Sequence, residues 1–313
     1  MSHRFADNVL ADLVGWADAG QATALATLIN VEPTGPRPTG SQMAVAASGD
    51  AVGFLSGGCV EAALVEECRM AMDAGENKVV RYGEGSPYLD IALPCGSAID
   101  VFVDTALDVE LARRIVAAQA ARQPVRLLTD IATGASRVAE TEDDGGRPEL
   151  IRDGDSIDRL YRPPLRLVVA GKGPVITAAV DVARAAGMAV EVVPGDDDTA
   201  EAAKAAGAQV TRRVGDVTLD LWCAVATLYH EHDLEGPTIE RALGSTAFYI
   251  GALGSRTTHA ERRSRLLAEG HNEADIGRIH GPAGLPIGSK SPPEIAVSVL
   301  AEVLAAYRDR FQA

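Results

Sequence analysis

A cysteine behind a pair of glycines is the first feature of the chain that could do chemistry. The segment reads Ser56-Gly57-Gly58-Cys59-Val60-Glu61, and a helical pattern runs from Val60 to Met72. Backbone N–H groups and the helix dipole favour negative charge at such a position, so the pKa of the Cys59 thiol should be lowered. A thiolate there suits sulfur or metal chemistry. Alternatively, a small cysteine beside glycines is simply packed in a core.

A second loop cysteine favours the chemical interpretation. Cys95 lies in a Pro/Gly loop before the strand expected at Ile99 to Val103, and two loop cysteines can converge on one site. Cys68 falls inside the helix pattern and Cys223 inside an apolar strand run, so we expect both to belong to the core. Cys59 and Cys95 are therefore the candidate sulfur ligands.

A glycine turn opens the second half of the chain. The apolar run Leu165 to Ala170 leads into Gly171-Lys172-Gly173-Pro174 and then a helix to Ala186. This order is typical of a nucleotide-binding α/β sheet, in which the first two glycines let the backbone approach a pyrophosphate. The third glycine of that fingerprint is replaced by Ile176, and we expect this side chain to hold strand and helix further apart.

The acidic residue that would bind ribose hydroxyls belongs just after the second strand, Met188 to Val193. There the chain reads Pro194-Gly195-Asp196-Asp197-Asp198, which could contact a ribose or could be a solvated turn.

Two further segments follow later strands of this sheet. His230-Glu231-His232 comes after Leu221 to Thr227, at the carboxyl edge where ligands bind in such sheets, and could ligate a metal or move protons. Histidines in loops are also often ordinary surface residues. Gly254-Ser255-Arg256 enters a helix that carries Arg262, Arg263 and Arg265. It predicts either an anion cradle or a turn with a solvated basic face.

The order of these segments along the chain predicts an α/β fold in two parts. We expect an amino-terminal mixed α+β domain over residues 1–145, a linker over 146–164 that ends in Pro163-Pro164, and a Rossmann-like doubly wound parallel sheet over 165–313. A Gly49-Asp50 turn predicts a hairpin in the first part. Ser291 and Glu294 have capping-box spacing at the start of the last helix.

Composition narrows the class of protein. The chain has 313 residues, 47% hydrophobic and 23% charged, with no apolar run of membrane-spanning length. The amino terminus lacks a signal-peptide core, and four irregularly spaced cysteines fit a reducing compartment, so we expect a cytoplasmic protein. A formal net charge of -15 argues against nonspecific nucleic-acid binding.

Taken together, these segments resemble the xanthine dehydrogenase accessory factor family, XdhC/CoxI. The resemblance covers most of the chain and rests on the order and spacing of several short motifs rather than on any one. They are Gly35-Pro36-Arg37-Pro38-Thr39-Gly40-Ser41-Gln42-Met43, Ser56 to Glu61, Cys95-Gly96, His230 to His232, Tyr249 to Arg256, and Pro282 to Gly288 with Pro293 to Ala296.

This resemblance implies a maturation protein that binds the molybdenum cofactor, supports its sulfuration and hands it to a xanthine dehydrogenase-type apoenzyme. The partners implied are that apoenzyme and a cysteine desulfurase, and relatives commonly self-associate. Cys59 and Cys95 would meet the molybdenum or dithiolene sulfur, with Cys59 and His230 as the catalytic candidates. The cofactor-binding set is Arg37, Ser56, Gly57, Gly58, Cys59, Cys95, Gly171, Lys172, Gly173, His230, Gly254, Ser255 and Arg256.

The chain departs from the family at the nucleotide site. Pro174 stands where the family usually has a histidine, and Pro194 where it usually has an acidic residue. The alternative hypothesis, an NAD(P)-dependent oxidoreductase with His230 as acid or base, is supported by the β-α-β order. Ile176, Pro174 and Pro194 count against it.

Overall fold

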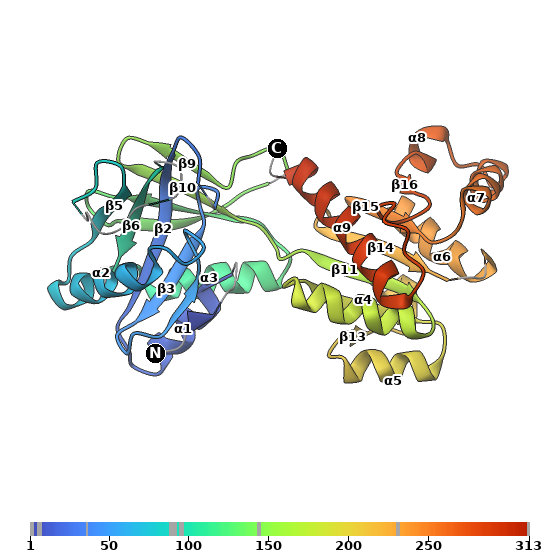
Figure 1. Cartoon of the computed structure of the whole chain (residues 1–313), viewed down its shortest axis with the longest axis horizontal. Helices are drawn as coiled ribbons and strands as arrows, with labels where there is room; N and C mark the ends of the chain where they lie inside the picture. Colours follow the sequence, from blue (N-terminus) through green and yellow to red (C-terminus); the bar gives the residue numbers. More distant parts are fainter. Residues whose placement is uncertain are drawn as a thin grey trace. The chain divides into compact units, whose positions relative to one another are not determined.

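Two compact units make up the chain. The computed structural model describes residues 3–4, 8–35, 37–87, 93, 97–142, 145–229 and 232–311. The first unit comprises Met1–Asp143 and Arg147–Pro163, and the second comprises Asp144–Gly146 and Pro164–Ala313. In Figure 1 the first unit runs from blue to green and the second from green to red. The last boundary between them falls at the Pro163-Pro164 pair.

A six-stranded sheet forms the centre of the first unit. Its order is β1-β4-β3-β2-β6-β5, with β1 parallel to β4 and the other neighbours antiparallel. The strands are β1 (His3–Arg4), β2 (Thr23–Glu32), β3 (Gln42–Ala46), β4 (Ala51–Gly53), β5 (Lys78–Gly83) and β6 (Ala98–Asp104). The hairpin predicted at Gly49-Asp50 is confirmed, because β3 and β4 pair around it.

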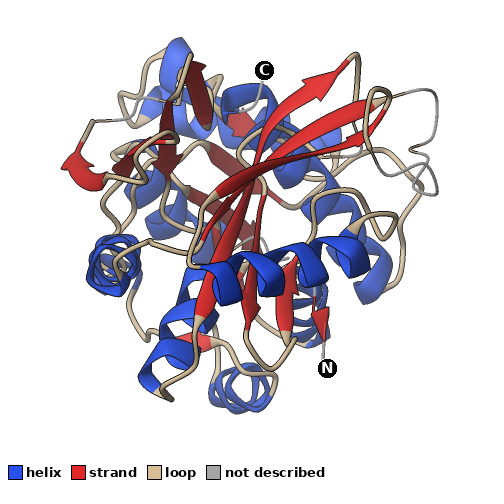
Figure 2. Ribbon diagram, turned by 90° about the vertical axis from the view of Figure 1, so that its left-hand side faces the viewer, coloured by secondary structure: helices blue, strands red, loops and turns tan. Residues whose placement is uncertain are grey.

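Helices cover both faces of this sheet (Figure 2). Alternate residues of β2 point to opposite sides, with Ala24 and Ala26 packing against α2 (Glu61–Ala74) and Leu25 packing on the opposite side. The helices on that opposite side are α1 (Leu10–Asp18) and α3 (Val109–Ala120).

A second, four-stranded antiparallel sheet completes this unit, in the order β8-β7-β10-β9. Its strands are β7 (Val125–Asp130), β8 (Ser136–Glu140), β9 (Leu150–Asp153) and β10 (Ser156–Tyr161). Residues 146–164, expected to be a linker, thus hold two strands of a sheet. Their sequence looked loop-like because β9 is exposed at three consecutive residues, Ile151, Arg152 and Asp153, and so lacks the apolar-polar alternation of a half-buried strand.

The second unit is the Rossmann-like sheet that the sequence predicts. All six strands are parallel, in the order β13-β12-β11-β14-β15-β16. They are β11 (Arg166–Gly171), β12 (Ala189–Pro194), β13 (Gln209–Val210), β14 (Cys223–Leu228), β15 (Tyr249–Ala252) and β16 (Ile279–His280). Numbered within this unit the order is 3-2-1-4-5-6, so the direction of winding changes between β11 and β14.

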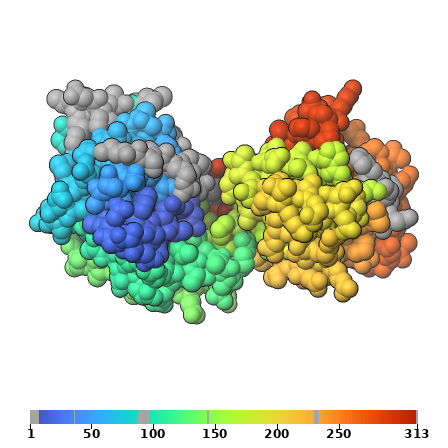
Figure 3. Space-filling model, turned by 90° about the horizontal axis from the view of Figure 1, so that it is seen from below, coloured from blue at the N-terminus to red at the C-terminus, as the bar shows by residue number. Residues whose placement is uncertain are grey.

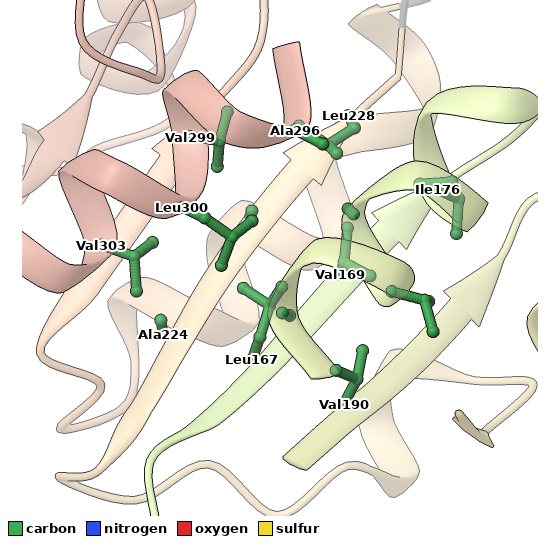
Figure 4. Close-up of a cluster of buried hydrophobic side chains, with 14 of the residues drawn as sticks. Leu167, Val169, Ile176, Val190, Ala224, Leu228, Ala296, Val299, Leu300 and Val303 are labelled. Carbon is green, nitrogen blue, oxygen red and sulfur yellow. The ribbon is translucent and has the colours of Figure 1, made fainter. Parts of the chain in front are cut away.

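Helices cover both faces of this sheet as well. One face carries α4 (Pro174–Ala185), α5 (Asp197–Ala205) and α9 (Pro292–Phe311), and the other carries α6 (His232–Leu243), α7 (Arg256–Ala268) and α8 (Glu273–Ile276). Figure 4 shows Val299, Leu300 and Val303 of α9 packed over β11 and β14. Figure 3 shows the outer surface of α4 and α5 in yellow-green and yellow.

The last helix begins as its sequence predicts. The Glu294 carboxylate accepts hydrogen bonds from Lys290 N at 2.8 Å and from Ser291 N at 2.9 Å, which is the glutamate half of a capping box. Within the described residues, no helix is both long and apolar enough to cross a membrane.

Candidate functional site

The cysteine loop, residues 55–60, joins β4 to α2 in the first unit. Cys59 is exposed on it, whereas Cys68 and Cys223 are buried, as predicted for core cysteines. Burial raises the pKa of the Cys68 thiol to about 12, so this group stays protonated. Cys95 and Gly96 lie outside the described residues, and the convergence of Cys59 with Cys95 stays a prediction. Of the described cysteines, Cys59 is the one that solvent reaches.

A buried carboxylate holds this loop together, and sequence reasoning missed it. Glu61, the first residue of α2, is 3% exposed. Its Oε1 accepts from Leu55 N at 3.0 Å and Ser56 N at 2.8 Å, and its Oε2 accepts from Gly58 N at 2.8 Å and Val60 N at 3.2 Å. The Ser56 hydroxyl also donates to Oε2, at 2.7 Å. A carboxylate directly after a glycine-rich loop was the signal that could have revealed it.

The ionisation of Glu61 follows from these contacts. Burial alone would raise its pKa, because desolvation penalises the charged form. The hydrogen bonds from the Ser56 hydroxyl and from the backbone N–H groups outweigh that cost, and the pKa of Glu61 lies below its usual value. A negative charge therefore sits permanently inside the cysteine loop at neutral pH.

The expected anion-favouring environment of Cys59 needs a correction for this reason. Cys59 N donates to the Ser56 hydroxyl at 3.0 Å, and Val60 N donates both to that hydroxyl, at 3.1 Å, and to Glu61. The N–H groups that would favour a thiolate or a bound anion thus already have acceptors within the protein. What the loop presents outward is the Cys59 side chain, not a nest of free donors.

The segment Gly35 to Met43, the other amino-terminal motif, largely joins the two sheets of the first unit. Arg159 Nε donates to Gly40 O at 2.8 Å. The buried Gln42 Nε2 donates to Thr27 Oγ1 at 3.0 Å and to the Tyr161 hydroxyl at 2.9 Å. Arg37 is half-buried in the loop between β2 and β3. Its predicted contact with a cofactor stays a prediction.

The glycine turn, residues 171–174, lies at the carboxyl end of β11 in the second unit. Gly173 N donates to Thr199 Oγ1 at 2.9 Å, and Ile176 N donates to Gly173 O at 3.1 Å. Pro174, the first residue of α4, has no N–H. In a dinucleotide fingerprint these three positions could donate to a pyrophosphate. Here the N–H groups of Gly173 and Ile176 already have acceptors within the protein, and Pro174 has no N–H.

Ile176 packs directly against Gly171, and its predicted effect on the separation of strand and helix stays a prediction. A Cβ placed on Gly171 would lie 2.6 Å from Ile176 Cδ1 and 3.0 Å from Leu228 O. The isoleucine is fully buried in the core, and it fills the space that Gly171 leaves free. A side chain at position 171 would therefore collide with Ile176.

The acidic run after β12 proves to be a helix start. Asp196 caps α5, and its carboxylate accepts from Thr199 N at 2.7 Å. Hydrogen bonds from the Thr199 side chain and backbone, together with the Lys172 charge, lower the pKa of this exposed group. Gly195 N donates to Gly171 O at 2.8 Å, so the ends of β11 and β12 are joined directly. Thr199 links the cap to the glycine turn.

The edge next to β14 is described only in part. Tyr229 is buried at the end of β14. A Cβ on Gly195 would lie 2.9 Å from Tyr229 Cε1 and 3.2 Å from Lys172 Cβ, so these three residues meet where the winding changes. His230 and Glu231 lie outside the described residues, and their predicted roles stay predictions. His232 is the first residue of α6 and does not continue an extended segment.

A buried arginine of α7 holds the loop that precedes this helix. Ser255 caps α7 by accepting from Thr258 N at 3.1 Å, and Arg256 is exposed at the first helical position. The buried Arg262 pairs with both carboxylate oxygens of Glu235 on α6, at 2.8 and 3.0 Å, and donates to Leu253 O at 2.8 Å. The basic face of α7 is thus not wholly solvated, since Arg262 fixes this loop.

The loop that follows β16 has its own acceptor, which the sequence did not reveal. Glu302 of α9 accepts from Gly284 N at 2.7 Å and from the Tyr249 hydroxyl at 2.6 Å, and it lies 3.2 Å from His280 Nδ1. Burial and the neighbouring carboxylate raise the pKa of Tyr249, which stays protonated. Glu302 therefore fixes the loop carrying Pro282 to Gly288.

Comparison with known proteins decides the family. Residues 16–83 match the profile of the XdhC and CoxI family, and residues 167–303 match the XdhC Rossmann domain. The molybdenum cofactor insertion chaperone PaoD of Escherichia coli K12 is 32% identical over 288 residues, which cover 91% of this chain and 83% of that protein. The chain belongs to the XdhC and CoxI family.

More distant relatives agree with this assignment. A protein of Bacillus subtilis, described as a probable subunit of xanthine dehydrogenase, is 24% identical over 312 residues, covering 90% of this chain and 92% of that protein. A crystal structure from Bacillus halodurans, described as a xanthine dehydrogenase, matches with a TM-score of 0.78 at 22% identity over 100% of this chain and 98% of that one. At that identity the structure supports the fold of this XdhC/CoxI protein and nothing further.

Both loops of interest fall within the matched regions. The cysteine loop lies inside residues 16–83, and the glycine turn and the start of α7 lie inside 167–303. Among the residues that the structure describes, no group of three or more His, Cys, Asp or Glu side chains is arranged to hold a metal ion. In the described part of this XdhC/CoxI protein, Cys59 therefore remains a single thiol, without a surrounding metal cluster.

Proposed function

We propose that this XdhC/CoxI protein binds the molybdenum cofactor, supports its sulfuration and delivers it to a xanthine dehydrogenase-type apoenzyme. Its relation to an insertion chaperone over 91% of the chain supports a maturation role. The observation that carries the proposal is the exposed thiol of Cys59, held on a fixed loop while the other described cysteines are buried.

Individual residues take roles that follow from their exposure. Cys59, together with Cys95, contacts the molybdenum or the dithiolene sulfur of the cofactor. A phosphate of the pterin is held by the cationic side chains of Lys172 and Arg256 more than by the backbone of the glycine turn, because Gly173 N already has an acceptor and Pro174 has no N–H.

The partners follow from the same chemistry. The cofactor has to leave for an apoenzyme of the molybdenum hydroxylase type, and sulfuration requires a sulfur source such as a cysteine desulfurase. We expect the protein to self-associate and to work in the cytoplasm.

Cofactor binding tests this function directly. Anoxic incubation of the full chain with molybdenum cofactor should give a stoichiometric complex after gel filtration, measured as molybdenum per chain. Cys59→Ala should weaken binding about tenfold or more, because a direct sulfur contact is lost. Cys68→Ala is the matched control, since Cys68 is buried in the same unit, and its binding should be unchanged. Undiminished binding by Cys59→Ala would remove the thiol from this role, and a Cys95→Ala variant tests the second cysteine in parallel.

A second candidate function rests on the strand order 3-2-1-4-5-6 of the second unit, which also serves NAD(P)-dependent oxidoreductases. Saturating NAD or NADP should then raise the melting temperature, because a ligand of the native state stabilises it. The contacts of Gly173 and Ile176 predict no such shift. A clear shift would favour this second function.

A further inference from the structure

The cysteine loop is closed around a charge supplied by the protein. Four backbone N–H groups and one hydroxyl donate to the two oxygens of Glu61. Such a wrap of donors around one carboxylate is what a glycine-rich loop before a helix normally offers to a bound anion. Here the anion is part of the chain.

The Ser56 hydroxyl extends this arrangement to the cysteine. It donates to Glu61 Oε2 at 2.7 Å and accepts from Cys59 N at 3.0 Å, so the backbone at Cys59 is held by Glu61 through one hydroxyl. Cys59 itself makes no part of the core and stays exposed. Ser56, and through it Glu61, therefore fixes the backbone that carries the Cys59 thiol.

We propose that Glu61 is the positioning residue for Cys59 and that, by occupying the anion site of the loop, it selects an uncharged or metal-centred ligand at the thiol over an anionic one. This inference rests on the proposed function and sharpens it. The soft metal end of a cofactor can approach Cys59, while its phosphate has to be bound by other residues.

A pair of thiol reagents of nearly equal size measures this selection without any cofactor. Iodoacetamide is neutral and iodoacetate is anionic, and both alkylate an exposed thiol. In the intact protein, alkylation of Cys59 is followed by mass spectrometry, and the ratio of the two rates reports the local charge. In Glu61→Gln the iodoacetate rate should rise relative to the iodoacetamide rate by about threefold or more, because a nearby negative charge is removed.

The matched control is Glu67→Gln. Glu67 is a second buried carboxylate on α2, but it forms an ion pair with Lys78 of β5. Its rate ratio should equal that of the wild type. An unchanged ratio in a folded Glu61→Gln protein overturns the proposal, because loosening of the loop alone would change both rates together.

A second variant keeps the test decisive if Glu61→Gln does not fold. Ser56→Ala retains the charge but removes the link to Cys59 N, so both alkylation rates should change by about threefold or more while their ratio stays at the wild-type value. Rates equal to wild type would contradict the positioning role. Since neither measurement uses molybdenum cofactor, a failure here is distinct from undiminished cofactor binding by Cys59→Ala, which would contradict the proposed function instead.

Discussion

The cysteine loop and the glycine turn differ in a way that their sequences conceal. Each is a glycine-rich connection from a strand to a helix, and each predicts backbone N–H groups that are free to hold an anion. In each, a side chain of the protein accepts hydrogen bonds from the loop: Glu61 accepts from several N–H groups in the first unit, and Thr199 accepts from Gly173 N in the second.

The nature of the acceptor separates the two loops. The cysteine loop encloses a buried negative charge, whereas the glycine turn uses a neutral hydroxyl and a proline that lacks an N–H. The neighbouring side chains differ as well: Cys59 is exposed on the cysteine loop, whereas Lys172 is half-buried in the glycine turn. A glycine-rich loop before a helix is thus an anion site only when no nearby side chain already satisfies it.

The largest loss of stability is expected from removing the Glu61 carboxylate. Glu61→Ala leaves several buried N–H groups without an acceptor and should lower the free energy of unfolding of the first unit by about 3 kcal/mol. Urea unfolding followed by Trp16 fluorescence in a Trp222→Phe background reports this unit. Glu66→Ala on the same helix, an exposed residue paired with Arg69, should cost less than about 0.5 kcal/mol. Equal losses in the two variants would show that Glu61 does not hold the loop.

A smaller loss is expected at the close contact of the glycine turn. Gly171→Ala pushes a methyl group against Ile176 and Leu228 O, and should cost about 2 kcal/mol through overpacking. Trp222 fluorescence in a Trp16→Phe background reports the second unit. Gly215→Ala is the control, because no atom lies within 4 Å of its added Cβ. Its unfolding curve should overlay the parent curve, and a Gly171→Ala curve that did the same would contradict the tight packing.

Removing the Thr199 hydroxyl, the neutral acceptor of the glycine turn, should lower stability by a still smaller amount. Thr199→Val keeps the shape of the side chain but takes the hydroxyl away from Gly173 N, which predicts a loss of about 1 kcal/mol in the second unit. Thr257→Val, on the exposed surface of α7, provides the comparison in the same unit. If both valine variants had the same stability, the bond between Thr199 and the glycine turn would contribute nothing.

The fold was largely predictable because its signals are local. Strands β11, β12, β14 and β15 read as short apolar runs since a parallel sheet buries both faces of each strand. Strands β9 and β10 were missed because neither shows a regular apolar-polar alternation: β9 is exposed at three consecutive residues, and β10 carries two adjacent charged residues, Asp158 and Arg159.

The site was predictable only in part, for the same physical reason. The glycines and Cys59 are visible in the sequence, but their hydrogen-bond acceptors depend on which elements the fold brings together. Thr199 lies 26 residues from Gly173, and Glu302 lies 53 residues from Tyr249. Glu61 is the exception, because it follows its loop directly and could have been predicted.

The pH dependence of stability gives the smallest expected effect and the finest distinction between the two loops. The pKa of Glu61 is lower in the folded protein than its usual value, so ionisation of this group stabilises the first unit. That contribution is fully present above the ordinary glutamate pKa of about 4.3 and is lost as the pH falls through the lower, folded-state value. Other buried acids, such as Asp104, titrate in wild type and variant alike and cancel in a difference.

The stability gap between wild type and Glu61→Gln, measured by urea unfolding of the first unit, should therefore stay constant from pH 7 to about pH 5 and shrink below the ordinary glutamate range. It should never exceed the loss in Glu61→Ala, because glutamine can still accept through one oxygen. Gly171→Ala places its methyl group against Ile176 and Leu228 O and not against a titrating group, so its loss of stability in the second unit should not vary over the same range. A gap that widened toward acid in the first unit would mean that Glu61 is buried as the neutral acid, and the charge would not be what distinguishes the cysteine loop from the glycine turn.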